Sequence, residues 1–151
     1  RDDGALQGEW RLRRLAIIGA GGHGAVVAEV AAASGEWSDI VFLDDRPAAD
    51  SVVGYAVAGG LDQLHAHLDE GSDVIAAIGD NSRRIELIEN IAGHSNALAT
   101  VVHPMSSVSP SAVISPGTVI CAGAIINARA SLGIACIVNT GARKIGSGVI
   151  K

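Results

Sequence analysis

Aromatic residues are scarce in this chain of 151 residues, at 3% of the total, which argues against a large aromatic-lined cavity. Charged residues are also few, at 18%, and the formal net charge is −5. A negative chain is a poor partner for nucleic acid or for an anionic membrane surface, although it can still carry one local anion site. No apolar run reaches the roughly 20 residues that a membrane span requires.

Cysteine is nearly absent as well. Cys121 and Cys136 show neither metal-ligand spacing nor the pattern of a disulfide framework, so we expect a reduced, cytoplasmic protein without a metal. The apolar run 15–18 follows several arginines, but glycines interrupt it too early for a signal peptide. Residues 1–13 are expected to form a disordered leader.

Aliphatic residues and glycine supply what the chain does contain: 48% of the residues are hydrophobic and 19 are glycine. From residue 14 to 99, short apolar runs alternate with helical patterns, which predicts βαβ units in a parallel sheet and a Rossmann-like α/β domain. Strands are predicted at Leu15–Ile18, Ile40–Leu43, Val74–Ile78 and Leu98–Val102, helices at Ala25–Ser34, Leu61–Leu68 and Arg83–Ala92, and a less regular piece at Val52–Val57.

After residue 100 the hydrophobic period changes to six. Large aliphatic residues recur at that spacing, and a small residue follows each of them four positions later. The aliphatic positions are Val102, Val108, Ile114, Ile120, Ile126, Leu132, Val138 and Ile150, and the small ones begin with Ser106, Ala112 and Thr118. This double pattern is typical of a solenoid whose units bury their faces by stacking, and it predicts a left-handed parallel β-helix over residues 100–151.

One position breaks the aliphatic pattern. Lys144, preceded by Arg143, takes the phase that should point into the apolar interior, where a lone ammonium is costly. Two interpretations stay open: the last hexads leave the β-helix, or the sequence past Ala142 is not a normal continuation. Eight hexads make fewer than three coils of about 18 residues, close to the minimum for a solenoid, so we expect this β-helix to be incomplete.

A glycine-rich turn follows the first predicted strand. Gly19, Gly21 and Gly24 satisfy the G-x-G-x-x-G pattern, and Gly22 and His23 lie within it. Such glycines let the backbone approach a diphosphate at a helix N-terminus, but a tight strand–helix turn needs small residues too. At the first helical turn the pKa of His23 should be lowered, so a neutral imidazole could contact a substrate or simply cover the turn.

Polar residues also follow the next strands, where ligands of open α/β sheets bind. Asp44 and Asp45 could hydrogen-bond a ribose, while Gly79, Asp80, Asn81 and Arg84 could hold a phosphate or a base edge. The alternative for the second group is helix capping and an exposed helix face. Asn139 and Thr140 are candidates for the lining of a cleft in the β-helix.

Together these motifs resemble the NeuD/PglD sugar acyltransferases. The resemblance runs from about Arg14 to Ala142 and rests on Gly-x-Gly-Gly-His-Gly, Asp-Asp, Ile-Gly-Asp-Asn-x-x-Arg, His-Pro and the hexads. It implies acetyl-CoA-dependent acetylation of a sugar or nucleotide-linked amino sugar in bacterial surface-glycan biosynthesis. It also implies a homotrimer, with acetyl-CoA between neighbouring β-helices and the sugar nucleotide held by residues 19–24, 44–45 and 79–84.

The resemblance also implies a catalytic histidine shortly after Asn139-Thr140, followed by an acid. In this sequence those positions are Gly146 and Ser147, which cannot serve as a base. Three alternatives therefore stay open: a sugar acetyltransferase, inactive as given for want of the histidine and of later coils; an NAD(P)-binding Rossmann module; and a non-catalytic trimeric scaffold.

Overall fold

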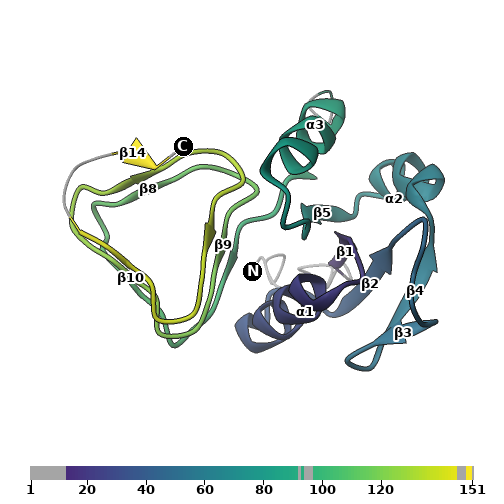
Figure 1. Cartoon of the computed structure of the whole chain (residues 1–151), viewed down its shortest axis with the longest axis horizontal. Helices are drawn as coiled ribbons and strands as arrows, with labels where there is room; N and C mark the ends of the chain where they lie inside the picture. Colours follow the sequence, from purple (N-terminus) through teal and green to yellow (C-terminus); the bar gives the residue numbers. More distant parts are fainter. Residues whose placement is uncertain (1–12, 92, 94–96, 146–148, 151) are drawn as a thin grey trace, which may run out of the picture.

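The computed structural model describes residues 13–91, 93, 97–145 and 149–150, so residues 1–12 of the expected leader, Gly146 and Ser147 lie outside the described residues. Figure 1 shows two parts side by side. One is a twisted sheet with helices packed on it, and the other is a triangular coil of short strands. None of the helices in the described part of the chain is long and apolar enough to cross a membrane.

The sheet contains five strands in the order β3-β4-β2-β1-β5. Four of them are parallel: β1 (Arg14–Ile18), β2 (Asp39–Leu43), β4 (Tyr55–Gly59) and β5 (Asp73–Ala76). If these four are counted along the chain, their order is 3-2-1-4, which is the Rossmann arrangement. The order reverses between β1 and β5, and such a switch point is where open α/β sheets bind ligands.

The segment predicted to be irregular is a β-hairpin. β3 (Ser51–Val52) pairs antiparallel with β4 through a two-residue turn, Val53-Gly54, in which both residues have positive φ. This geometry matches the turns that join two-residue hairpins. Valine is an unusual residue at the first position of such a turn, and Val-Gly is a weaker hairpin signal than Asn-Gly or Gly-Gly.

Helices connect the strands close to the predicted places. α1 (Gly22–Ser34) starts three residues earlier than expected and ends at Gly35, whose φ is 71°. A short 3-10 turn, η1 (Leu61–Gln63), leads into α2 (Leu64–Asp69), and α3 covers Asn81–Ile91. Asp80 caps α3, because its Oδ1 accepts the Arg83 N–H at 2.8 Å.

The coil is a parallel β-helix in which each strand pairs with the strand 18 residues away. Its nine strands form three sheets, β6-β9-β12, β7-β10-β13 and β8-β11-β14. They are β6 (Val101–Val102), β7 (Ser107–Val108), β8 (Val113–Ile114), β9 (Val119–Ile120), β10 (Ile125–Ile126), β11 (Ser131–Leu132), β12 (Ile137–Val138), β13 (Arg143–Lys144) and β14 (Val149–Ile150).

The predicted aliphatic positions form the interior of this coil. Ile120, Ile126 and Leu132 are almost fully buried there together with the small residues Ala124 and Ala130. The prediction of a fourth sheet strand at Leu98–Val102 is wrong: Leu98 makes only a single bridge to Val74, and Val101–Val102 belongs to the coil. The chain leaves the sheet here because Val101 pairs with Val119 in the next coil.

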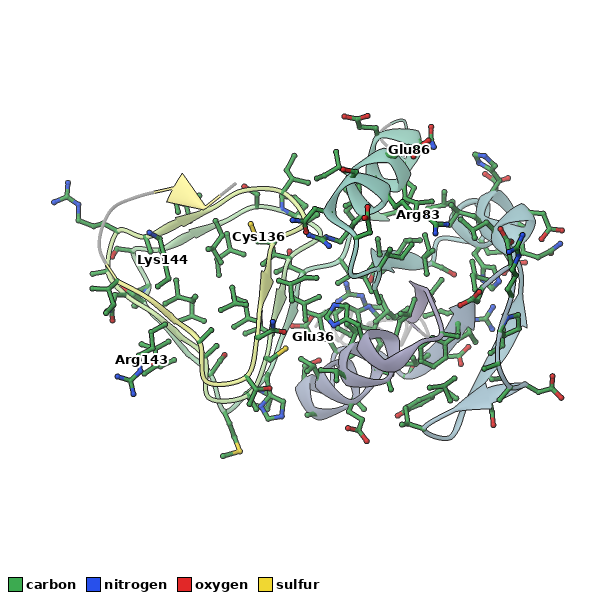
Figure 2. All side chains as sticks on the ribbon, viewed as in Figure 1. Glu36, Arg83, Glu86, Cys136, Arg143 and Lys144 are labelled. Atoms are coloured by element: carbon green, nitrogen blue, oxygen red, sulfur yellow. The ribbon has the colours of Figure 1, made fainter. Side chains whose placement is uncertain are left out.

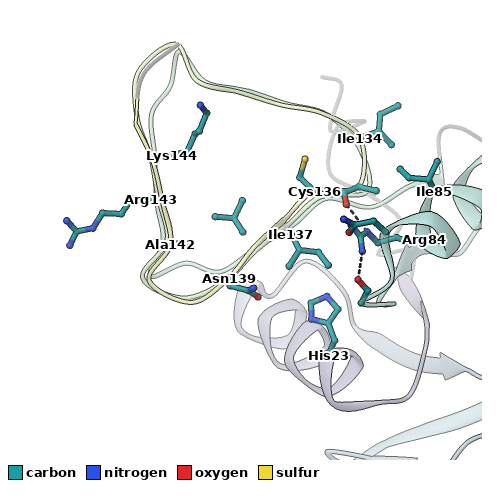
Figure 3. A pocket seen from close by; sticks show the side chains of 14 residues that line it. His23, Arg84, Ile85, Ile134, Cys136, Ile137, Asn139, Ala142, Arg143 and Lys144 are labelled. Carbon is teal, nitrogen blue, oxygen red and sulfur yellow. Dashed lines mark hydrogen bonds between the residues drawn. The ribbon is translucent and has the colours of Figure 1, made fainter. Parts of the chain in front are cut away.

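Lys144 stays in the coil. β13 pairs with β10 in register, so Lys144 lies beside Ile126, and the interpretation that the chain leaves the β-helix at this point is wrong. Its side chain is half-buried and points into the coil, whereas Arg143 points away from it (Figure 3). The ammonium therefore lies over an apolar interior.

A shared hydrophobic core joins the two parts. Outward-facing residues of the coil, Val119 and Cys121 among them, are buried in the same cluster as Val27, Ala28 and Ala31 of α1. Figure 2 shows side chains filling the space between the coil and the helices of the sheet domain. The sheet and the coil are thus packed as one body, and their junction can hold a site of fixed shape.

Candidate functional site

A cavity of about 620 Å³ lies at the junction between the sheet and the coil. Figure 3 shows that its residues come from the start of α1, the end of β5 with α3, and the last coil. The lining residues are His23, Gly79, Asn81, Arg84, Ile85, Ile134, Ala135, Cys136, Ile137, Val138, Asn139, Ala142, Arg143 and Lys144. The cavity therefore opens at the switch point of the sheet, as the topology leads one to expect.

The glycine-rich turn packs tightly at two of its glycines and is open at two others. A Cβ on Gly24 would lie 2.0 Å from the carbonyl oxygen of Gly19, and Gly19 itself has a φ of 106°. A Cβ on Gly21 or Gly22 would meet nothing within 4 Å. The first turn of α1 has no side-chain cap, so its N–H groups can donate to an anionic or polar ligand.

Of the site residues predicted in this turn, His23 lines the cavity. Its Nε2 is fully buried and has no hydrogen-bond partner within the described residues. Burial lowers the pKa of His23, and the nearby Arg84 guanidinium lowers it further. A neutral imidazole is thus held in the cavity wall, and no described group of the protein bonds to its Nε2.

Asp44 and Asp45 hydrogen-bond to backbone N–H groups of nearby loops. Asp44 accepts the Ala20 N–H at 2.8 Å through Oδ2 and the Arg46 N–H at 2.9 Å through Oδ1. Asp45 accepts the Leu61 N–H at 2.8 Å. Neither carboxylate lines the cavity, and Asp44 occupies a loop N–H that a diphosphate could otherwise use. The predicted contact with a ribose stays a prediction.

The predicted site residues from Gly79 to Arg84 have different roles in the structure. Asp80 is the α3 cap described above, and Gly79 and Asn81 line the cavity. Arg84 is only 6% exposed, and its guanidinium donates to the carbonyl of Ile78 at 2.8 Å, to Asn81 Oδ1 at 2.6 Å and to the carbonyl of Ala135 at 2.9 Å. Arg84 is therefore held by the protein itself, across the junction of the two parts.

The coil contributes Asn139, which lines the cavity, while Thr140 is exposed beside it. Sequence reasoning missed the apolar wall, which consists of Ile85, Ile134 and Ile137. Ile85 and Ile134 are 39% and 53% exposed. These residues take positions outside the coil interior or on the rim of α3, so hydrophobic periodicity carries no signal for them.

The charge of the cavity is opposite to that of the chain. Arg84, Arg143 and Lys144 are among its lining residues, although the Arg143 side chain points away from the coil and the Lys144 side chain points into it, and no carboxylate among the described residues lines it. Cys136 also lines it, but burial raises the pKa of this thiol, so it is a poor nucleophile at neutral pH. No group of three or more potential metal ligands is found in the described part of the chain. The arrangement favours an anionic ligand with an apolar portion.

Known proteins share this architecture. The model of the PglD N-terminal domain family matches residues 14–91, more than half of the chain. The acetyltransferase domain of PglB from Neisseria gonorrhoeae FA1090 is 44% identical, with a TM-score of 0.85, over 91% of this chain and 67% of that one. The same domain in complex with acetyl coenzyme A gives a TM-score of 0.86 at 44% identity, over 91% of this chain and 66% of that chain.

A second relative is PerB from Caulobacter crescentus, solved in complex with CoA and GDP-perosamine. It is 35% identical, with a TM-score of 0.76, over 85% of this chain and 61% of that one. The chain spans about two thirds of the length of these relatives. No curated protein matches it significantly. The matched family model and the relatives identify the chain as a member of the NeuD/PglD-type sugar acyltransferase family.

Proposed function

We propose that this chain binds acetyl-CoA and a sugar, or a nucleotide-linked amino sugar, as an acetyltransferase of bacterial surface-glycan biosynthesis. The observation that carries the proposal is the junction cavity, which is lined by cations and by apolar residues and by no described carboxylate. Both ligands combine phosphates with less polar portions, and such a lining suits them. The relatives solved with acetyl coenzyme A and with GDP-perosamine support the same pair of ligands.

The two parts of the chain would hold different ligands. The open first turn of α1, at Gly21 and Gly22, would receive the phosphates or hydroxyls of the sugar nucleotide. The uncommitted nitrogen of His23 would orient the sugar group that accepts the acetyl. Asn139 and the neighbouring coil residues would face the acetyl-CoA.

In the reaction, an amine or hydroxyl of the sugar attacks the thioester carbonyl. A C–N or C–O bond forms, the C–S bond breaks, and the proton lost by the nucleophile is taken by a base and returned to the thiolate. A positioned base would contribute roughly 10²–10⁴-fold to this step. The position of the family's histidine falls on Gly146, so we expect this chain to bind its ligands without catalysing transfer by itself.

The finer features of the assembly follow from the family. We propose a cytoplasmic homotrimer of left-handed β-helices, in which acetyl-CoA lies between neighbouring coils. The NAD(P)-binding alternative is disfavoured because the glycine-rich domain is joined to a β-helix, and relatives with this architecture are acetyltransferases. The trimeric scaffold without ligands remains as an outcome of the test.

The test is a calorimetric titration of the chain with acetyl-CoA, with UDP- and GDP-amino sugars and with NADH. We expect binding of acetyl-CoA and of an amino-sugar nucleotide and no binding of NADH. Gly22→Ala should weaken the binding of the sugar nucleotide, because the added Cβ would occupy space that is open beside Gly22. Gly93→Ala is the matched control, since its Cβ also meets nothing within 4 Å but the residue lies past the C-terminal end of α3, outside the glycine-rich turn.

Two results would count against the proposal. An intact trimer that binds neither acetyl-CoA nor a sugar nucleotide would favour the scaffold. Tight binding of NADH would favour the dinucleotide module. A thiol-release assay with both substrates tests the expected lack of turnover: steady release of CoA would show that another group replaces the base absent from position 146.

A further inference from the structure

Arg84 is a buried charge without a charged partner. Its side chain is one of few polar side chains in the core, and no described carboxylate forms an ion pair with it. Burying an uncompensated guanidinium is costly, and apolar replacements of buried ions are often neutral or stabilising. A role in stability alone is therefore a weak explanation for an arginine at this place.

The acceptors of Arg84 lie on both sides of the cavity. On the sheet side they are the carbonyls of Ile78 and Gly79, at 2.8 and 3.4 Å, and Asn81 Oδ1 at 2.6 Å. On the coil side it is the Ala135 carbonyl, at 2.9 Å from Nε. Gly79, Asn81 and Ala135 themselves line the cavity. One side chain thus joins two walls that are 51 residues apart in the chain (Figure 3).

The backbone of the coil turns a corner at this contact, where φ is positive as it is at residues 117, 123, 129 and 141. Ala135 has a φ of 57°, a left-handed conformation that is uncommon for a residue with a side chain. It is fully buried, and its N–H bonds to the Pro116 carbonyl at 3.1 Å. Non-glycine residues in this region persist only where their surroundings hold them. The Arg84 bond is one of the contacts that hold Ala135.

We propose that Arg84 is a positioning residue that locks the end of β5 to the coil corner at Ala135, and so fixes the distance between the two walls of the cavity. Its planar fork reaches carbonyls in several directions at once, which a lysine ammonium on one flexible stem cannot reproduce. That this fixed distance helps a ligand to contact both walls rests on the proposed function. That Arg84 holds the two walls together does not depend on it.

Hydrogen exchange of the ligand-free chain, followed by NMR, tests the lock. The variants are Arg84→Met, Arg84→Lys and, as a matched control, Arg83→Met, which removes the exposed arginine next along α3. Reporters at the junction are the N–H groups of residues 84 and 135, which bond to Asp80 and Pro116. Reference reporters are the N–H groups of Asp44, in the sheet, and Val113, on a remote coil face.

We expect exchange at both junction reporters to accelerate about tenfold or more in Arg84→Met and in Arg84→Lys, while the references stay within about twofold. Arg83→Met should change neither set. Equal acceleration at all reporters would reduce Arg84 to a general stabilising residue and overturn the proposal, as would unchanged exchange. Unchanged exchange at the junction reporters in Arg84→Lys would show that the positive charge matters and the planar shape of the guanidinium does not. If Arg84→Met fails to fold, Arg84→Lys alone gives the comparison.

A second measurement separates this inference from the proposed function. Where the wild-type chain binds acetyl-CoA, both Arg84 variants should bind it more weakly and Arg83→Met should bind it equally well. A wild-type chain that binds no acetyl-CoA would contradict the proposed function, while the exchange data would still decide the lock.

Discussion

At the scale of single residues, the glycine-rich turn contains two kinds of glycine with different tasks. Gly24 is required by packing, because its Cβ would collide with the Gly19 carbonyl and touch the Phe42 ring at 3.2 Å. Gly22 has open space where its Cβ would lie. The fold therefore requires glycine at position 24. At position 22 glycine is required only for the ligand binding that we propose.

This difference can be measured with two alanine variants. Gly24→Ala should destabilise the chain by about 3 kcal/mol or more, because backbone atoms must move to admit the Cβ. Gly22→Ala should leave the stability unchanged or raise it by about 0.5 kcal/mol, since alanine favours helix over glycine. Urea unfolding checks both. Equal destabilisation by the two variants would contradict the assigned roles.

His23 should make stability depend on pH in one direction. Burial, and then Arg84, lower the pKa of His23 in the folded chain below its ordinary value of about 6.5. The unfolded chain therefore binds the proton more readily. Above pH 6.5 His23 does not change the free energy of unfolding. As the pH falls from 6.5 toward the lower pKa of the folded chain, His23 lowers that free energy.

His23→Gln should remove this part of the acid sensitivity. The free energy of unfolding, measured in urea about one pH unit above and one below 6.5, should fall less for the variant than for the wild type. NMR titration of the ring protons gives the pKa directly, and Arg84→Met should raise it. A His23 pKa at or above the ordinary value would show that the imidazole is not held neutral.

Much of the candidate site could be predicted because its glycines and polar residues follow apolar strands. The turn at 19–24 and Gly79–Asn81 do lie at the switch point. What the sequence could not reveal is which polar groups the protein itself satisfies. Asp44 accepts from backbone N–H groups, and Arg84 donates to backbone carbonyls and to the Asn81 side chain; three-dimensional packing decides these partners.

At the scale of elements, the coil could be predicted from its strong periodicity, whereas elements that depend on a local exception could not. The six-residue pattern places Ile120, Ile126 and Leu132 in the interior because each coil repeats the geometry of the last. The hairpin at 51–59 was missed because Val53 adopts a positive φ without a glycine or asparagine. Val101–Val102 was assigned to the wrong sheet because an apolar pair fits either neighbour.

Lys144 gives an element-scale prediction. It holds an interior position of β13 beside Ile126, where a charge contributes less than an apolar group. Lys144→Met should raise the free energy of unfolding by about 0.5–1 kcal/mol. Arg143→Met is the matched control on the same strand, because Arg143 points outward and is exposed. Destabilisation by Lys144→Met, relative to this control, would show that the ammonium has a structural partner.

At the scale of the whole molecule, the core that contains α1 and the outer face of the coil couples the two parts. Val119 is buried against this core although its neighbour Ile120 fills the coil interior. One strand thus contributes to two cores on opposite sides. Neither part can unfold without exposing apolar surface of the other, which favours a single cooperative transition.

The chain contains probes that can test this coupling separately for each part. Both tryptophans, Trp10 and Trp37, precede residue 100, and both cysteines, Cys121 and Cys136, follow it. Tryptophan fluorescence therefore reports the first part. Cys121 lies in the shared core and Cys136 in the coil interior, so labelling of Cys136 in a Cys121→Ser background reports the coil. We expect the two unfolding curves in urea to coincide, and Val119→Ala to shift both equally, by about 1–2 kcal/mol. Separate midpoints, or a shift of the thiol curve alone, would show two independent units and a cavity whose walls are joined only locally at Arg84.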